Sequence, residues 1–416
     1  MKIFRKTLIT VIVAALLINI CGCSSSKNIM DDVTAQKVTA LENLSGETVI
    51  MNDFSVKFLN ACHNKGKNTF VSPLSAAYAL GLTINGADGE TLTQMEKTLG
   101  MKRQDLNLYL YSLMQSLNKD IGTESNAKFN LANSVWFTDS NRFEIKKDFL
   151  QANADYYKSQ IYREPFDSST VKKVNDWVSE QTNGMIKDIV NDSFFSENAI
   201  MCLVNALCFE GEWQEIYTEN DVKKDTFTNA SGKKQKCDFM FSEESSFIED
   251  DNATGFIKYY KNSTFAFVAV LPNKGITADE YVSALTGEKL TRLLESRRNA
   301  TVNTSMPKFE AEYTLNLSDP LKKMGMPLAF DSSHADFSAM GSSSNGNIYI
   351  KYAIQKNYIS VAEQGTKAGA ATVIYAEDFF ALPQEVKYVY LNRPFVYMII
   401  DTVTNVPLFI GTMNNV

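Results

Sequence analysis

Apolar residues in the first half of the chain recur three or four positions apart, the spacing that places them on one face of an α-helix. One of these segments begins with Ser72 and Pro73, a pair typical of an N-cap and a first helical turn. The pattern predicts helices at Val49–Cys62, Pro73–Ile84, Thr91–Leu99, Gln104–Leu117, Ile145–Tyr157 and Val171–Gln181.

The second half is dominated by runs of β-branched and aromatic residues bounded by turn residues. Because helices gather in the first half and strands in the second, this order favours an α+β fold over a repeating βαβ sheet. The predicted strands are Lys128–Phe137, Ala199–Phe209, Thr264–Leu271, Thr301–Tyr313, Ile348–Ala362, Val386–Leu391, Pro394–Val403 and Pro407–Met413.

The stretch from Glu363 to Phe380 has a period of two built from small residues. Two structures fit this pattern. The segment could be a loop in one state and an inserted strand in another, or it could be an ordinary Ala/Gly-rich linker or edge strand. On the pattern alone the second structure is the more frequent outcome. In an extended chain one face would carry Thr366, Ala368, Ala370, Thr372, Ile374 and Ala376.

The first 22 residues have the pattern of a secretion signal. Lys2, Arg5 and Lys6 give a positive start, and an apolar run follows from Thr7 to Ile20. This run is too short to cross a bilayer comfortably, which takes about 20 apolar residues. Residues 23–46 are predicted to be a polar tether and the start of the first helix, and residues 47–416 a single domain.

Composition and charge narrow the function. Hydrophobic residues make up 44% of the chain, enough for a large core, and no linker or repeat divides it. The net charge of −7 is mild and no basic stripe occurs, so nucleic acid is not expected as a partner.

Candidate catalytic and metal-binding residues are few. His63 and His334 are the two histidines, which argues against a histidine-based metal site, and no cofactor is expected. Cys62 next to His63 could suggest a nucleophile and a base, but sequence neighbours on a helix point apart. No G-x-S-x-G motif occurs, and Ser116–Lys119 is an isolated S-x-x-K. Free buried thiols are the expectation for Cys62, Cys202, Cys208 and Cys237.

The segment E-Q-G-T-K-A-G-A-A-T, from Glu363 to Thr372, resembles the hinge of inhibitory serpins, with Lys367 where an acidic residue is usual. Further stretches resemble serpin motifs in order and at family spacing over nearly the whole domain. They are Asn68–Ser75 (NTFVSPLS), Gly86–Thr91 (GADGET), Val204–Trp213 (VNALCFEGEW), Met306–Phe309 (MPKF), Ala335–Ser338 (ADFS), Asn392–Phe395 (NRPF) and Phe409–Gly411 (FIG).

The resemblance implies a serpin fold, with helices packed around a large central sheet plus two smaller sheets, and an exposed reactive-centre loop at about residues 364–385. It implies that Trp213 lies at the top of the main sheet, where Lys308 pairs with Glu363. Gln355 stands where the family often has His. The implied hinge is Glu363, Gly365, Thr366, Ala368, Gly369, Ala370, Ala371 and Thr372, and the implied sheet-opening residues are Ser72, Ser75, Asn205, Gln355, Trp213 and Lys308.

The resemblance further implies a suicide inhibitor of serine endopeptidases rather than an enzyme. By the family's spacing from Glu363, the reactive bond is Phe379–Phe380, within one residue, which suits a chymotrypsin- or subtilisin-like protease. Cleavage would form an acyl-enzyme, and the freed hinge would insert into the central sheet before hydrolysis. A monomer is expected, and inhibition of cysteine proteases is left open.

The junction after the signal, Ile20-Cys21-Gly22-Cys23, resembles the bacterial lipoprotein cleavage box. It implies a surface lipoprotein anchored to the membrane through a lipid on Cys23. The alternative is a plain signal peptide with an incidental Cys. Two other functions remain open at this point: a non-inhibitory serpin that acts as a surface binding protein, and an unrelated surface hydrolase.

Overall fold

The computed structural model describes residues 28–120, 127–140, 142–192, 194–195, 199–261, 263–344, 346–366 and 385–416. Its helices match the predicted ones closely, and α2 has the predicted bounds. Short α7, α8 and α9 were not predicted. The helices are α1 Ser45–Cys62, α2 Pro73–Ile84, α3 Gly89–Leu99, α4 Arg103–Asp120, α5 Lys147–Tyr157, α6 Ser168–Gln181, α7 Ala278–Ala284, α8 Gly287–Glu295 and α9 Ser318–Met324.

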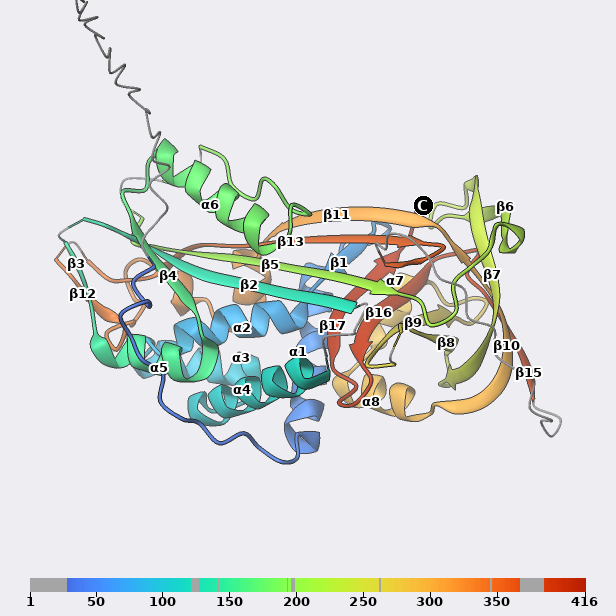
Figure 1. The fold of residues 1–416 in the computed structure, drawn as a ribbon, viewed down its shortest axis with the longest axis horizontal. Coiled ribbons are helices and arrows are strands. Elements are labelled where there is room, and N and C mark those ends of the chain that lie inside the picture. The colour runs from blue at the N-terminus through green and yellow to red at the C-terminus, as the bar shows by residue number, and fades with distance from the viewer. Residues whose placement is uncertain are drawn as a thin grey trace, which may run out of the picture.

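A six-stranded mixed sheet runs through the middle of the molecule (Figure 1). Its strands β5 and β13 are parallel neighbours over much of their length. In spatial order the strands are β11 Phe309–Asn316, β13 Ile350–Ala362, β14 Gly365–Thr366, β5 Met201–Glu212, β2 Ala127–Thr138 and β4 Gln160–Glu164.

A second sheet of nine strands and a two-stranded sheet complete the fold, so the predicted α+β architecture with three sheets is confirmed. The two-stranded sheet joins β3 Phe143–Ile145 to β12 Gly341–Ser343. The nine-stranded sheet contains β1 Thr69–Val71, β17 Pro407–Met413, β16 Phe395–Asp401, β9 Phe265–Pro272, β8 Ala253–Tyr259, β7 Lys234–Glu249, β10 Arg298–Pro307, β15 Val386–Tyr390 and, paired to β7, β6 Val222–Thr228.

Two predicted elements were wrong: one helix begins later than predicted, and one predicted strand is two strands. The predicted helix Ile145–Tyr157 begins at Lys147, because Phe143–Ile145 pairs with β12. The predicted strand Thr301–Tyr313 divides at Lys308 into β10 and β11, which lie in different sheets. Lys308 N still donates to the Asp238 carbonyl (2.8 Å), which follows the β10–β7 register, and from Phe309 onward the chain pairs with β13 instead.

The six-stranded sheet is covered on both faces. Helix α6 lies over one face, with Trp177 packed edge-on to Trp136 and Tyr162, whose rings stack 4.4 Å apart. Helix α2 lies under the opposite face, and all of its residues are buried. Opening this sheet therefore moves strands that are held between two apolar layers.

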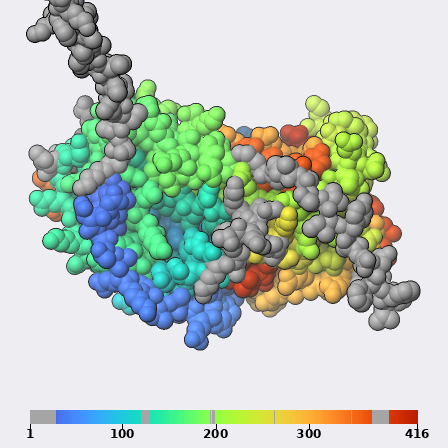
Figure 2. Space-filling view, in the orientation of Figure 1, coloured from blue at the N-terminus to red at the C-terminus, as the bar shows by residue number. Residues whose placement is uncertain are grey.

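The described N-terminal segment, residues 28–44, lies along the outside of the domain, where Figure 2 shows it in blue beside the teal and green elements. Ile29 N donates to Ile161 O (2.8 Å), Gln36 N to Asp155 Oδ1 (2.7 Å) and Leu41 N to Ser112 Oγ (2.8 Å). This part of the predicted tether is thus bound to β4, α5 and α4. Among the described helices, none combines the length and the apolar character that a membrane span requires.

Candidate functional site

A buried network of amides and hydroxyls joins the two middle strands of the six-stranded sheet. Asn205 of β5 and Gln355 of β13 are direct register partners, and Gln355 Nε2 donates to Asn205 Oδ1 (3.1 Å). Both side chains are fully buried. Because this bond crosses between β5 and β13, it must break if another strand enters between them.

The N-terminus of α2 holds the same network from below. The backbone of Ser72 exchanges two hydrogen bonds with the Gln355 amide (3.0 and 2.9 Å). Ser75 Oγ donates to Asn205 Oδ1 (2.7 Å), and Asn205 Nδ2 donates to Ser75 O (2.6 Å). Ser72 also caps α2 by accepting from Ser75 N (3.1 Å). The structure therefore brings together Ser72, Ser75, Asn205 and Gln355, four of the residues that the resemblance implied for the sheet-opening region, and their role in opening stays a prediction.

Two members of this network were missed. Asn133 of β2 lies opposite Asn205 and accepts a hydrogen bond from its amide. Asn357, two residues after Gln355 on the same face of β13, donates to Gln355 Oε1 (2.9 Å) and to Phe70 O (3.2 Å). The available signal was an amide side chain inside a predicted strand, since buried polar groups need partners.

We expect sheet opening to be independent of pH between 5 and 8, because amides and hydroxyls do not titrate there. Replacing Gln355→His should introduce a step near the ordinary histidine pKa of about 6.5. The measurement is the rate of loop insertion at each pH, followed by tryptophan fluorescence, with both proteins compared at the same pH. A step near pH 6.5 in the unsubstituted protein would contradict this expectation.

The start of the predicted hinge already lies between β5 and β13. Gly365 pairs with Ala362 of β13 on one side and with Glu212 of β5 on the other. Thr366 likewise pairs with β13 and, on the β5 side, with Gly211. Thr366 is 1% exposed, and its hydroxyl lies 2.6 Å from the Tyr260 hydroxyl. The two-residue strand β14 thus occupies the top of the gap into which a longer strand could extend.

Gly365 is at a position that no larger residue can occupy. Its φ is +152°, and a Cβ placed on it would lie 1.9 Å from the carbonyl oxygen of Gly211. Because the contact is with backbone, a side chain cannot be accommodated by rotation. A glycine is therefore needed for the chain to enter between β5 and β13.

Trp213 closes the top of the sheet, as predicted. Its ring stacks on Tyr260 with centroids 4.4 Å apart, and its Nε1 donates to Ala362 O (2.9 Å). Its backbone N–H donates to Gln364 O (2.9 Å). Trp213 is therefore a core aromatic residue that also holds the turn leading into the hinge.

Lys308 and Glu363 form the predicted ion pair at this level, with Nζ and Oε1 2.5 Å apart. Partial burial opposes ionisation of Glu363, but the hydrogen bond and charge of Lys308 outweigh it, so the pKa of the carboxyl lies below its usual value. A lowered pKa means that the pair is intact at neutral pH and is lost as the pH falls through that pKa. Since both side chains are one-third exposed, the pair contributes about 1 kcal/mol at most.

A buried lysine below Trp213 was not predicted. Lys258 Nζ lies 2.8 Å from Glu244 Oε1, 4.4 Å from the ring centroid of Tyr217 and 5.6 Å from that of Trp213. The lysine is 2% exposed, so its charge is balanced by the carboxylate and by the two ring faces. Tyr217 N donates to Glu363 O (2.9 Å), which connects this cluster to the base of the hinge.

Replacing Lys258→Met should lower the free energy of unfolding by about 3 kcal/mol, because it leaves Glu244 buried without its partner. Urea unfolding followed by circular dichroism measures the change. Lys261→Met is the matched control: Lys261 is half-buried, lies 3.6 Å from Glu212 and should cost less than about 1 kcal/mol. Equal losses in the two variants would show that the buried pair adds nothing.

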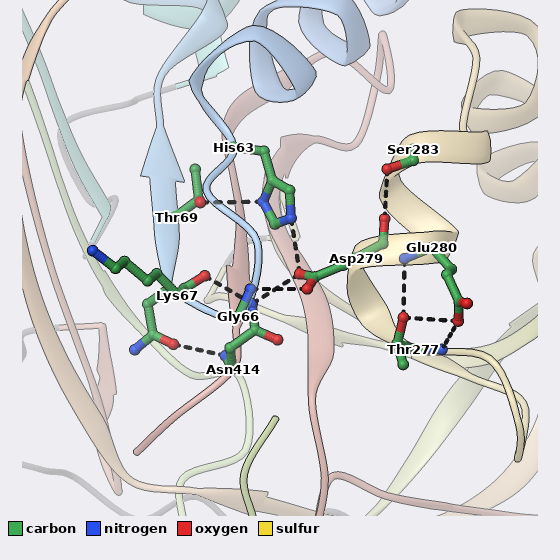
Figure 3. Close-up of polar contacts among 10 residues, drawn as sticks. His63, Gly66, Lys67, Thr69, Thr277, Asp279, Glu280, Ser283 and Asn414 are labelled. Atoms are coloured by element: carbon green, nitrogen blue, oxygen red, sulfur yellow. Dashed lines mark hydrogen bonds and ion pairs between the residues drawn. The ribbon is translucent and has the colours of Figure 1, made fainter. Parts of the chain in front are cut away.

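Cys62 and His63, considered above as a possible nucleophile and base, have separate structural environments. Cys62 is buried, and burial raises the pKa of its thiol to about 12. His63 contacts Asp279 through Nε2 (2.8 Å) and Thr69 through Nδ1 (3.3 Å), as Figure 3 shows. Asp279 also accepts from Gly66 N (2.8 Å). The histidine thus ties the end of α1 to β1 and α7.

Several predicted residues lie outside the described part of the chain. They are Cys23, Ala368, Gly369, Ala370, Ala371, Thr372, Phe379 and Phe380. Cys62 and Cys202 are buried free thiols, and Cys208 is also buried, whereas Cys237 is a half-buried free thiol. Within the described ranges, no group of three or more His, Cys, Asp or Glu side chains is arranged to hold a metal ion.

Comparison with known proteins places these features in a family. Residues 50–416 match the family model Serpin (serine protease inhibitor). An uncharacterized serpin-like protein of Thermococcus kodakarensis is 28% identical, over 88% of this chain and 84% of its own. A leukocyte elastase inhibitor of Xenopus tropicalis is also 28% identical, over 89% of this chain and 99% of its own.

Two solved structures of one protein are informative together. The native state of the thermophilic serpin Tengpin is 42% identical, covers 94% of this chain and 100% of its own, and superposes with a TM-score of 0.88. Its latent state, at 40% identity and with 92% and 100% of the two chains covered, superposes with a TM-score of 0.78. The arrangement described here is therefore closer to the native state of that relative than to its latent state.

Proposed function

The chain belongs to the serpin family, and from that premise we propose that it is a suicide inhibitor of chymotrypsin- or subtilisin-like serine endopeptidases. Serpins are protease inhibitors for the most part, and some are not inhibitory. The proposed partner is a serine protease that cleaves the segment between Thr366 and Glu385, with no cofactor involved.

One observation carries the proposal: Gly365 and Thr366 already pair with both β5 and β13. The strand is antiparallel to each neighbour, so its continuation would extend down the gap between them. The small residues that follow in the sequence, Ala368 to Ala371, carry no charge that would have to be buried there. A hinge built for insertion is what an inhibitory serpin requires.

The proposed reaction is a single acyl transfer. The hydroxyl oxygen of the protease serine bonds to the carbonyl carbon of Phe379, and the Phe379–Phe380 amide bond breaks. The proton of the hydroxyl passes through the protease's base to the departing amine of Phe380. The freed hinge then extends β14 between β5 and β13, and the ester-linked protease is carried along before water can attack the ester.

The residues around the proposed bond favour one class of protease. Phe379 suits a deep apolar specificity pocket, as in chymotrypsin- and subtilisin-like enzymes. Glu377 and Asp378 precede it and should repel proteases with acidic subsites.

We further propose that the mature protein is a cell-surface lipoprotein, anchored through Cys23. The position of the N-terminal segment supports this. Asn28 pairs with Tyr162 on β4, at the end of the molecule far from β15, where the loop returns to the domain (Figure 1). An anchor at Cys23 would hold the opposite end, where β15 lies, away from the membrane.

The test is incubation of the protein with chymotrypsin and with subtilisin, followed by denaturing gel electrophoresis. We expect a complex that survives denaturation, together with a released fragment that mass spectrometry shows to begin at Phe380. Protease with its active-site serine chemically blocked is the control and should give neither. Cleavage without a stable complex would refute inhibition and favour a non-inhibitory surface protein.

A further inference from the structure

Strand β15 displays large apolar side chains to solvent immediately after the loop. Val386, Tyr388 and Tyr390 are 50%, 65% and 41% exposed. They are three of the five large hydrophobic residues that are exposed in the described part of the chain. The two tyrosine rings lie with centroids 6.1 Å apart. Exposed apolar side chains gathered in one patch mark an interaction site more often than scattered ones do.

The outward orientation of these residues is fixed by Lys387 and Val389, the alternate residues of the strand, which face the domain. Val389 is buried, and Lys387 Nζ lies 5.0 Å from the ring centroid of Phe247 while pairing with Glu385 (2.7 Å). A shift of one residue in the register would expose Val389 and turn the tyrosines inward. The strand therefore holds its charged residue against the domain and its aromatic residues in solvent, the reverse of the usual alternation.

The position of this surface relative to the loop is also fixed. Thr301 N donates to Glu385 O (3.0 Å), and the Glu385 carboxylate lies 3.6 Å from Arg298. From Val386 to Tyr390 the strand pairs with β10 in parallel register. The end of the loop is thus pinned to the domain at Glu385, and the tyrosines lie three and five residues further on.

We propose that Val386, Tyr388 and Tyr390 form a secondary docking surface for the target protease, in addition to the reactive loop. The proposal rests on the proposed function. Phe380 is five residues before Glu385, so even a fully extended chain separates them by about 18 Å. A protease of about 250 residues has a radius of gyration of about 18 Å, so a protease bound at Phe379–Phe380 is large enough to reach the pinned end of the loop. Strand β15, which begins at that end, therefore lies within reach of the bound protease.

The chemistry of the surface defines what the protease must present. Tyrosines bury large area with little loss of conformational entropy and are enriched among residues that dominate binding energy. The matching patch would be apolar, with polar groups for the two phenol hydroxyls, and would lie beside the part of the cleft that holds residues after the cleaved bond. The surface would select among proteases that share the same preference for phenylalanine.

The test compares the double variant Tyr388→Ser/Tyr390→Ser with Val403→Ser, which removes an equally exposed apolar residue from the turn between β16 and β17. The measured quantity is the association rate constant with chymotrypsin and with subtilisin. We expect the association rate constant of the double variant to decrease about tenfold with at least one of the two proteases, and that of Val403→Ser to stay unchanged. A shorter-lived encounter complex leaves fewer encounters to proceed to acylation. The stoichiometry of inhibition and the unfolding temperature should stay unchanged.

Unchanged association rates with both proteases would overturn the docking surface while leaving inhibition intact. If the unsubstituted protein forms no complex with either protease, inhibition itself is refuted. Analytical ultracentrifugation tests whether a second copy of this chain binds the surface instead. Self-association that is lost in the double variant, without any change in rate, would assign the surface to a second copy of this chain and overturn the proposal.

Discussion

Cleavage of the Phe379–Phe380 bond is expected to raise the unfolding temperature of the protein by about 10 °C or more. The strand β14 now ends at the level of Gly211, and its continuation could extend between β5 and β13 to the level of Met201. In doing so it would replace one parallel ladder by two antiparallel ladders. The number of strand-to-strand hydrogen bonds would therefore increase in the centre of the sheet.

The size of this increase follows from general values. A backbone hydrogen bond contributes about 1 kcal/mol net, and about ten more of them would add about 10 kcal/mol. Unfolding entropy is about 2.1 cal/mol/K per residue, so for a domain of this size each kcal/mol shifts the unfolding temperature by about 1 °C. Differential scanning calorimetry of intact and cleaved protein measures the shift.

The intact protein incubated with serine-blocked protease is the control for this measurement. Its unfolding temperature should equal that of untreated protein. If the cleaved form unfolded at the same temperature as the intact form, insertion of the loop would not lead to a more stable state. The proposal that insertion traps the protease would then be wrong, whatever its similarity to other serpins.

Replacing Thr366→Arg is expected to convert the inhibitor into a substrate. Thr366 is 1% exposed, and its hydroxyl lies 2.6 Å from that of Tyr260. An arginine at this position would have to bury its charge without a partner or leave the gap between β5 and β13. Either outcome slows insertion at its first step, so hydrolysis of the acyl-enzyme finishes first.

The measurement is the partition between stable complex and cleaved inhibitor on a denaturing gel, which should change from mainly complex to mainly cleaved product. Thr366→Ser is the matched control, because it keeps the hydroxyl near Tyr260 and should still form the complex. The same gel would contradict the expectation if Thr366→Arg gave as much stable complex per cleaved molecule as the unsubstituted protein.

Much of the fold could be predicted from the sequence. The bounds of α2 follow from Ser72, Pro73 and the apolar run after them, since a cap and a helical period are local signals. Of the hinge, the pair of Glu363 with Lys308 is also as expected, whereas the contact of Thr366 with Tyr260 was not predicted. Local pattern and family motif together identified which residues meet at the top of the sheet.

Other features could not be predicted, because they depend on contacts between distant parts of the chain. Nothing local distinguishes Lys258, which is buried against Glu244, from the exposed lysines around it. The division of the predicted strand at Lys308 depends on its partner strands, since Pro307 pairs with β7 and Phe309 pairs with β13. His63 has its partner at Asp279, on α7.

The sequence alone determined helices α1 to α6, about half of the described strands, the small uncharged face of the hinge and the family motifs, since each depends on neighbouring residues. The tertiary structure alone decided that Gly365 and Thr366 already lie between β5 and β13, and that the tyrosines of β15 face solvent. The reason is that a period of two shows that a strand has two faces. Which face is buried, and between which neighbours the strand lies, depends on surfaces brought together only by folding.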